Sequence, residues 1–237
     1  MDVVEVVERQ MCRTQLGWEK LYEEKRAYWS HDNNFSRPHV ELTTLGMHAR
    51  DFFNSKLVMA DPCALREIVV GIVDRYIAQG GVTSFVERVV GPEKALAQAL
   101  CDEINIRTRD EDRGPKGPCQ WGSLTKVGEG SSKKFVFDDP EHAVEEGEIV
   151  LLSDDVFTTG GTLKLAMNAV RERKGRLLGF VCIIVNRSSD DKVEKKEIVS
   201  LIKKPMVVYH PDACPLCDER SVAVRAQGNW DLLTAEY

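Results

Sequence analysis

Apolar residues along the chain form two kinds of pattern that alternate with each other. An unbroken apolar run at 149–152 predicts a strand that is buried on both faces of a sheet. The largely apolar segment 177–186 predicts a second buried strand, and 85–90 predicts a further strand. Apolar residues at helical spacing predict helices at 62–79, 95–104 and 163–173. Because strands and helices alternate, we expect an α/β fold in which a central, mostly parallel sheet is flanked by helices.

The two ends of the chain follow this pattern less closely. Apolar residues at roughly helical spacing between 3 and 29 predict one or two helices outside the main sheet, divided at Gly17, that form a cap or a dimer arm. Alternation at Val40 and Leu42 predicts a β-hairpin within 37–61. We therefore expect three parts: a small N-terminal helical arm and hood at 1–60, a core at 61–204, and a C-terminal tail at 205–237 that packs on the core.

The stretch 147–162 adds chemistry to the end of a predicted strand. Asp154 and Asp155 follow the apolar run, and a loop of threonine and glycine at 158–162 opens the next helix. Ligands of open α/β sheets bind beyond the carboxyl ends of the strands. Free N–H groups at a helix N-terminus attract an anion, and glycine lets it approach closely. The loop fits one phosphate monoester and the two carboxylates fit the vicinal hydroxyls of a sugar, which together describe ribose 5-phosphate.

Composition excludes several other classes of protein. The formal net charge is −6 and no long basic run is present, so nucleic acid is not an expected partner. The longest purely apolar run, 180–185, is too short to cross a membrane. Seven cysteines, an odd number, indicate reduced thiols, and the N-terminus has no signal-peptide pattern. We therefore expect a cytoplasmic protein.

The sequence VLLSDDVFTTGGT at 150–162 resembles the phosphoribosyl pyrophosphate (PRPP) signature of type I phosphoribosyltransferases. The resemblance implies that family's fold for the core and catalytic roles for Asp154 and Asp155 beside the reacting ribose. It also implies Mg²⁺ that is carried mainly by PRPP, no metal held by the protein itself, and a homodimer. The implied PRPP-binding residues are Asp154, Asp155, Val156, Phe157, Thr158, Thr159, Gly160, Gly161 and Thr162.

Two other segments take roles from the same resemblance. The loop before the helix at 95–104 stands at the family's pyrophosphate loop, which makes Lys94 and Ala95 the candidate pyrophosphate ligands. The Gly-, Pro- and charge-rich segment 107–134 stands at the family's mobile lid. There SLTKVGEGSSKKFVF puts Lys126 at the position of the catalytic lysine, and Lys116 is the alternative.

Four residues are implied in binding of the base through a resemblance to the orotate phosphoribosyltransferase branch of the family. In that branch an aromatic pair packs on the base, here Phe52 and Phe53. An arginine contacts the carboxylate of the base, here Arg187, because its planar fork suits bidentate binding. Thr158, from the loop, completes the set.

The expected function is therefore transfer of the phosphoribosyl group from PRPP to a nucleobase, with orotate as the base. Thr44-Leu45-Gly46 stands where the branch often has Ser-Gly beside a lysine. This departure leaves a phosphoribosyltransferase for a purine or another base as the first alternative. A PRPP- or nucleotide-sensing protein without catalysis is the second.

Cys214 and Cys217 form a CxxC pair in the tail. Such a pair can be half of a zinc site or a redox pair. No second CxxC and no HxxxH completes four ligands, and no thioredoxin-like βαβ pattern surrounds the pair. The tail resembles the C-terminus of the orotate branch, so we predict a structural role, with metal binding as the alternative.

Overall fold

The central sheet of the protein confirms the predicted α/β fold. The computed structural model describes residues 13–42, 46–113 and 117–235. The sheet consists of β5 (Arg88–Gly91), β6 (Gln120–Val127), β7 (Lys134–Phe137), β8 (Ile149–Phe157), β9 (Arg176–Asn186), β10 (Lys192–Val193) and β11 (Lys196–Lys203). Their order is β10-β11-β9-β8-β5-β6-β7. The five inner strands run parallel, and β10 and β7 are antiparallel edge strands.

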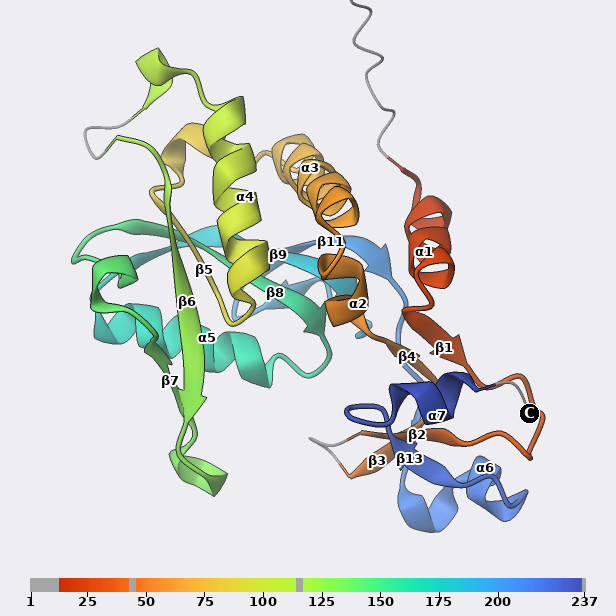
Figure 1. Cartoon of the computed structure of the whole chain (residues 1–237). Helices are drawn as coiled ribbons and strands as arrows, with labels where there is room; N and C mark the ends of the chain where they lie inside the picture. Colours follow the sequence, from red (N-terminus) through yellow and green to blue (C-terminus); the bar gives the residue numbers. More distant parts are fainter. Residues whose placement is uncertain (1–12, 43–45, 114–116, 236–237) are drawn as a thin grey trace, which may run out of the picture.

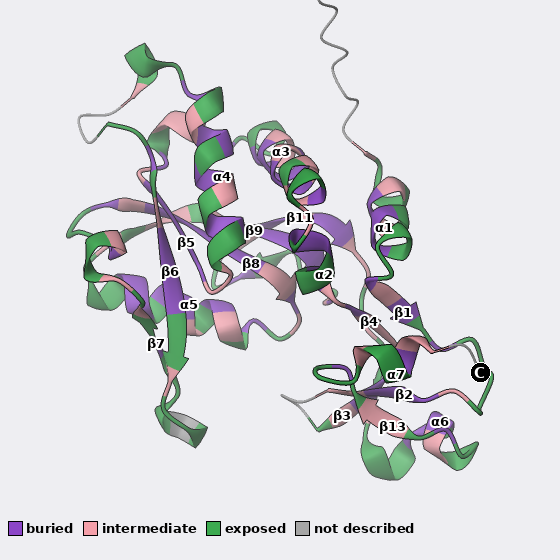
Figure 2. Cartoon of the chain, viewed as in Figure 1, coloured by how far each residue is buried: buried purple, intermediate pink, exposed green. Residues whose placement is uncertain are grey.

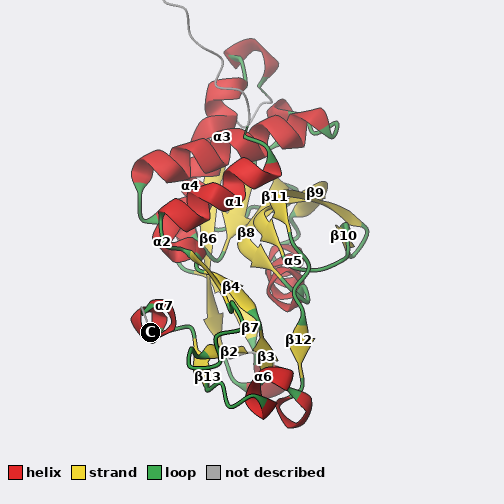
Figure 3. Cartoon of the chain, turned by 90° about the vertical axis from the view of Figure 1, so that its right-hand side faces the viewer, coloured by secondary structure: helices red, strands yellow, loops and turns green. Residues whose placement is uncertain are grey.

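Helices cover both faces of this sheet (Figures 1 and 3). On one face lie α1 (Gln15–Glu24), α3 (Pro62–Ala78) and α4 (Lys94–Arg107), and on the other lies α5 (Gly161–Glu172). Helix α3 begins as the sequence predicts, because the Asp61 side chain accepts hydrogen bonds from the N–H groups of Cys63 and Ala64. None of the helices in the described ranges is long and apolar enough to cross a lipid bilayer.

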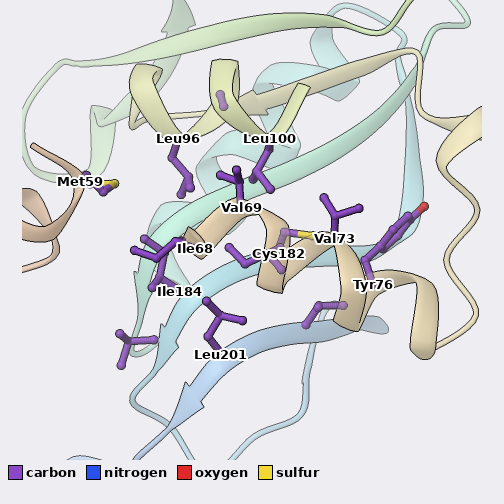
Figure 4. Packing of buried hydrophobic residues seen from close by; sticks show 14 of the residues in the cluster. Met59, Ile68, Val69, Val73, Tyr76, Leu96, Leu100, Cys182, Ile184 and Leu201 are labelled. Carbon is purple, nitrogen blue, oxygen red and sulfur yellow. The ribbon is translucent and has the colours of Figure 1, made fainter. Parts of the chain in front are cut away.

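The main core lies between α3, α4 and the sheet, where the buried stripes of the helices face the strands (Figures 2 and 4). Fully buried side chains from α3, α4, β9 and β11 meet there: Ile68, Val69, Val73, Leu96, Leu100, Cys182, Ile184 and Leu201. A second cluster beneath α5 covers the opposite face of β8 and β9. Burial on both faces explains why 149–152 of β8 and 180–185 of β9 are unbroken apolar runs.

A second, smaller sheet forms the hood, which we define as residues 28–53 and 206–235. Its strands are β2 (His39–Leu42), β3 (Met47–Ala49), β12 (Val208–Tyr209) and β13 (Ala223–Arg225), in the order β12-β3-β2-β13. The hood also contains β1 (Tyr28–Ser30), β4 (Asp51–Phe53), α6 (Pro215–Asp218) and α7 (Trp230–Thr234), and α2 (Ser55–Met59) connects it to α3. The predicted hairpin is thus present as β2 and β3.

The C-terminal tail supplies both edge strands of the hood sheet. Strand β12 pairs with β3, and β13 pairs in parallel with β2. The small core of the hood joins residues from both ends of the chain: Trp29, Val40, Ala49, Ala226 and Leu233. The tail therefore builds the hood together with the N-terminal hairpin, and the division of the chain at 60 and 204 stays a prediction.

The N-terminal segment differs from the prediction in two respects. Gly17 does not divide two helices; it lies within α1, where its N–H donates to the Oγ1 of the capping residue Thr14. Trp29 lies in β1 and not in a helix. Trp18 of α1 packs against Gly71 of α3, where a Cβ would come within 2.5 Å of the indole ring, so α1 is part of the main core. Residues 1–12 of the predicted arm lie outside the described residues.

Candidate active site

The two aspartates of the predicted site lie within strand β8. We expected this strand to end near Leu152, but it continues to Phe157. Strand β5 pairs with β8 only as far as Leu152, whereas β9 pairs with it as far as Phe157. Asp154 and Asp155 therefore sit on a part of β8 that still has hydrogen bonds to β9 but has lost its neighbour on the other side. The open edge of β8 leaves room for a ligand at the carboxyl end of the sheet.

The loop after β8 turns sharply into α5. Gly160 has a positive φ of +76° and caps the helix, and a Cβ there would lie 2.9 Å from the ring of Phe157. Glycine is therefore the residue that this turn accommodates. The first N–H groups of α5 have no partner within the helix and lie beside the loop, which suits an anion.

A cavity of about 450 Å³, the loop cavity, opens over this turn. Its floor is formed by the loop and the first turn of α5. The antiparallel pair β6 and β7 and the connection between them form the lid hairpin, which contributes Lys126 of β6 and Gly130 and Lys133 of the connection to the cavity wall. The remaining lining residues are Asp154, Val156, Phe157, Thr158, Thr159, Gly160, Gly161, Thr162, Lys164 and two leucines, 163 and 165. The cavity thus joins helix N–H groups, hydroxyls and ammonium groups, all of which favour a phosphate.

A second cavity of about 480 Å³, the hood cavity, lies between the sheet and the hood. Its lining includes aromatic residues, Asp155 and Arg187, with contributions from both ends of the chain: Leu42, Phe52, Phe53, Asn54, Ser55, Lys56, Leu57, Met206, Ala226, Gln227, Gly228 and Trp230. The two cavities share Val156, Thr158 and Thr162. A ligand in one cavity would therefore touch a ligand in the other beside the aspartates.

The electrostatics of the aspartate pair depend on burial. Burial raises the pKa of Asp155 to about 6, and the negative charge of Glu93 adds to this rise. Burial also raises the pKa of Asp154 well above its usual value, and repulsion from Asp155 adds to it. Backbone N–H groups of Asp155 and Val156 donate to Asp154 Oδ1 and Asp155 Oδ1, at 3.0 and 2.8 Å. These bonds only partly offset the rise, so the site favours a cationic partner.

Comparison with known proteins identifies the family. A model of the phosphoribosyl transferase domain matches residues 122–214. An orotate phosphoribosyltransferase of Pelotomaculum thermopropionicum is 35% identical over 190 residues, which are 79% of this chain and 87% of that protein. The chain belongs to the type I phosphoribosyltransferase family.

Two further comparisons agree with this membership. An orotate phosphoribosyltransferase of Desulforamulus reducens is 25% identical over 190 residues, 79% of this chain and 86% of that protein. The crystal structure of orotate phosphoribosyltransferase from Aeropyrum pernix has a TM-score of 0.53 at 16% identity, and the match covers 78% of this chain and 92% of that one. The latter shows that the fold is shared.

In this phosphoribosyltransferase the segment predicted as a lid is only partly a loop. Strand β6 begins at Gln120 and pairs in parallel with β5, so it belongs to the main sheet. Its outer end pairs with β7, and there Lys126 is exposed and lines the loop cavity. Lys116, the alternative lysine, lies outside the described residues. The catalytic role of Lys126 stays a prediction.

The candidate pyrophosphate residues lie at the carboxyl end of β5. Lys94 begins α4, and its Nζ lies 5.0 Å from the ring centroid of Trp121. Neither Lys94 nor Ala95 lines the loop cavity or the hood cavity. A contact from the Lys94 ammonium to pyrophosphate stays a prediction.

The candidate base residues meet in the hood cavity of the phosphoribosyltransferase. Phe52 is half-buried and faces Trp230 at 6.0 Å between ring centroids, whereas Phe53 is buried against Tyr22 and Tyr28. The two phenylalanines therefore differ: Phe52 has a free ring surface in the cavity, and Phe53 is mainly a core residue. Thr158 lines both cavities, and its contact with a base stays a prediction.

Arg187 is buried at the exit of β9. Its Nη2 is paired with Asp51, and its Nε donates to the carbonyl oxygen of Lys204 at 3.0 Å. Among the described residues these are the hydrogen-bond partners of its guanidinium group, which leaves the Nη1 group for a ligand. Asp51 thereby fixes the orientation of the guanidinium group at the wall of the cavity.

Several lining residues were not predicted from the sequence. Lys133 and Lys164 line the loop cavity, and Lys56 and Trp230 line the hood cavity. Lys164 lies in the first turn after the glycine loop, a position that could have been recognised. Trp230 is far from the other residues in sequence, and only the hood sheet brings it to the site.

Proposed function

We propose that the protein transfers the 5-phosphoribosyl group from PRPP to orotate, giving orotidine 5′-monophosphate and pyrophosphate. The observation that carries this proposal is the contact between the loop cavity and the hood cavity beside Asp154 and Asp155. One cavity has the groups that suit a phosphorylated sugar, and the other has the aromatic and guanidinium groups that suit a planar anionic base. The bond between sugar and base would form where the cavities meet, at Thr158 and Thr162.

The loop and the two aspartates would bind different parts of the ribose phosphate. The N–H groups at the start of α5 and the loop hydroxyls bind the 5-phosphate. Asp154 and Asp155 accept hydrogen bonds from the ribose hydroxyls and place negative charge near the anomeric carbon, which becomes cationic as pyrophosphate leaves. Lys126, on the lid hairpin, neutralises charge on the departing pyrophosphate and helps to exclude water.

The carboxylate cluster also suits Mg²⁺ as the cofactor. Burial raises the pKa values of Asp154 and Asp155, the negative charge of Glu93 adds to both rises, and repulsion from Asp155 adds to the rise of Asp154. Mg²⁺ prefers oxygen ligands and is commonly held by substrate phosphates with one or two carboxylates. When bound, it would neutralise charge on the pyrophosphate group, while Asp154 and Asp155 orient the ribose.

Orotate is the proposed base because it carries a carboxylate that purines and uracil lack. Arg187 offers Nη1 at the wall of the hood cavity, and Lys56 adds a second positive charge to its lining. The ring of Phe52 offers an apolar face on which a planar base can stack. The relatives that carry the name orotate phosphoribosyltransferase support the same choice.

The substrate assignment is tested by incubating the protein with PRPP, Mg²⁺ and one base at a time, and measuring pyrophosphate release. We expect release with orotate to exceed that with uracil, adenine, hypoxanthine or guanine by at least about 100-fold, because a base without a carboxylate would leave the Nη1 group of the buried Arg187 without a hydrogen-bond partner. Faster release with a purine or uracil would overturn the assignment. Binding of PRPP without release for any base would indicate a sensor.

Arg187→Ala should raise KM for orotate by about 30- to 100-fold, since a charge-assisted hydrogen bond is worth about 2–3 kcal/mol. KM for PRPP should change by less than about 3-fold, because the loop cavity does not include Arg187. Steady-state kinetics with each substrate varied in turn checks the split.

Arg187→Lys is the matched variant for this experiment. It keeps a positive charge beside Asp51 but loses the planar fork, and it should recover the stability of the fold more than the affinity for orotate. Equal increases in KM for PRPP and orotate in both variants would remove Arg187 from the base site.

The proposal also includes a cytoplasmic location and a homodimer. The six described cysteines are unpaired, which fits a reducing compartment such as the cytoplasm. The homodimer that the family resemblance implies stays a prediction.

A further inference from the structure

Four side chains that bind metals converge in the hood, away from the active site. His39 of β2, His48 of β3, and Cys214 and Cys217 at α6 place one ligand atom each within 4.8 Å of one another. The Nε2 of His39 lies 3.0 Å from the Nδ1 of His48 and 3.6 Å from both sulfur atoms. The Cys217 Sγ lies 3.3 Å from the His48 Nδ1.

These distances match a tetrahedral zinc site. Zn–N bonds of about 2.0–2.1 Å and Zn–S bonds of about 2.3 Å separate the ligand atoms of a tetrahedron by about 3.3–3.8 Å. The four pair distances above, 3.0–3.6 Å, fall within a few tenths of an ångström of that range. The pattern of two imidazoles and two thiols is the Cys₂His₂ set of structural zinc sites, and soft thiolates disfavour Mg²⁺ and Ca²⁺.

The backbone sets up this cluster from both ends of the chain. Glu41 pairs with His48 across the hairpin, and His39 is two residues before Glu41, so the two imidazoles share one face of the hood sheet. Cys214 caps α6 and Cys217 lies within its single turn, three residues on, so both sulfur atoms face the same way.

A hydrogen bond orients the first histidine as metal ligation requires. The His39 Nδ1 lies 2.9 Å from the Ser221 Oγ, and that hydroxyl donates to the carbonyl oxygen of Arg37 at 2.7 Å. The hydroxyl proton is thereby committed to the carbonyl, so the hydroxyl accepts from the imidazole and His39 keeps its proton on Nδ1. The Nε2 lone pair then points at the cluster, an arrangement typical of ligating histidines.

We propose that His39, His48, Cys214 and Cys217 bind one structural Zn²⁺ that fastens the C-terminal tail to the N-terminal hairpin. The site is closed, since His39, His48 and Cys214 are buried and all four positions come from the protein. Such a link would strengthen the hood, because the small core of its described residues is a cluster of five buried apolar residues. The sequence search for a second CxxC or HxxxH missed these ligands, because the two histidines are nine positions apart on neighbouring strands.

Zinc would act on the active site only through the hood. The hood carries Met206, Gln227, Gly228 and Trp230 to the wall of the hood cavity, whereas the loop cavity is built from the main sheet and the lid hairpin. The metal is therefore a support of one substrate cavity and takes no part in the reaction. This inference rests on the ligand cluster alone and stands whether or not orotate is the base.

Metal analysis of the full-length protein, purified under reducing conditions without a histidine tag, tests the proposal. We expect about one zinc per chain. X-ray absorption at the zinc edge should show two sulfur atoms at about 2.3 Å and two nitrogen atoms at about 2.0–2.1 Å. Cys217→Ser should lower the zinc content at least 10-fold, whereas Cys63→Ser, which alters an exposed cysteine outside the cluster, should leave it unchanged.

Hydrogen exchange of the wild-type protein gives a readout that does not depend on the folding of a variant. Removing the metal with a chelator should speed exchange in β2, β3 and β13 at least 10-fold and leave β8 and β9 unchanged. Adding Co²⁺ should restore protection and produce the absorption of tetrahedral cobalt with thiolate ligands. Failure of the reduced protein to take up Zn²⁺ or Co²⁺, a disulfide between Cys214 and Cys217, or equal uptake by Cys217→Ser would overturn the proposal.

Discussion

Asp155→Asn should lower kcat by about 100-fold or more while leaving the fold intact. The substitution keeps the shape of the side chain but removes the negative charge beside the anomeric carbon, and electrostatic contributions of this kind are worth about 3–4 kcal/mol. Steady-state release of pyrophosphate measures the loss. Asp191→Asn is the matched control, because Asp191 is exposed and pairs with Lys203 on the surface. Unchanged turnover in Asp155→Asn would remove this aspartate from the catalytic site.

The same variant should be more stable than the wild type at neutral pH. The pKa of Asp155 is raised from 3.8 to about 6, so above pH 6 the folded state carries a charge that burial disfavours. Asparagine removes this cost, which amounts to up to about 3 kcal/mol.

The stability difference between Asp155→Asn and the wild type should depend on pH, because the pKa of Asp155 is higher in the folded than in the unfolded state. Between pH 4 and 6 the folded wild-type protein binds the proton that the unfolded chain releases, so the wild type becomes more stable relative to the variant as the pH falls. The advantage of Asp155→Asn should therefore be complete at pH 8 and shrink to about half at pH 5. Urea unfolding at the two pH values checks this. An advantage that grows at pH 5 would contradict the raised pKa, and Asp191→Asn should change stability by less than about 1 kcal/mol at either pH.

Lys126→Ala should lower kcat by about 100- to 1,000-fold with a much smaller change in KM for orotate. Lys126 lines the loop cavity, and its ammonium group would stabilise charge that develops on pyrophosphate in the transition state, so its loss should affect turnover more than binding. Single-turnover measurements separate the chemical step from product release.

Lys134→Ala is the control for the lid hairpin. Lys126 pairs with Phe135 and Val127 pairs with Lys134, so the two lysines occupy neighbouring rungs and point to opposite faces. Lys134 is exposed and does not line the loop cavity. We expect near wild-type kinetics for Lys134→Ala. Comparable losses in the two variants would mean that the hairpin tolerates no change, and full activity of Lys126→Ala with loss in Lys116→Ala would transfer the role to Lys116.

Strand β8 and its loop illustrate what could be predicted from the sequence. The apolar run, the two aspartates and the glycine loop are contiguous, and each follows a local rule of burial, hydrogen bonding or backbone freedom. Only the end of the strand was misplaced, at Leu152 and not Phe157, because pairing with β9 continues after β5 has ended. Local pattern cannot reveal how far a neighbouring strand extends.

Site residues that come from distant parts of the sequence were harder to predict. Arg187 was identified as a base residue, but its pairing with Asp51 became visible only in the structure. Lys133, Lys56 and Trp230 carry no local signal that separates a lining residue from an ordinary surface or core residue. Gly17 shows the opposite error, since a glycine within a helical pattern predicts a break, whereas Gly17 lies within α1.

The sequence by itself determined the α/β core and the candidate ribose-phosphate site at 150–162, because contiguous residues form its strand, its turn and the helix N-terminus. Only the tertiary structure decided which other residues surround that site. Pairing of the tail with the N-terminal hairpin formed the hood cavity and brought Cys214 and Cys217 to His39 and His48. Such contacts depend on the register between strands about 180 residues apart, which cooperative packing of the whole chain fixes and no local pattern encodes.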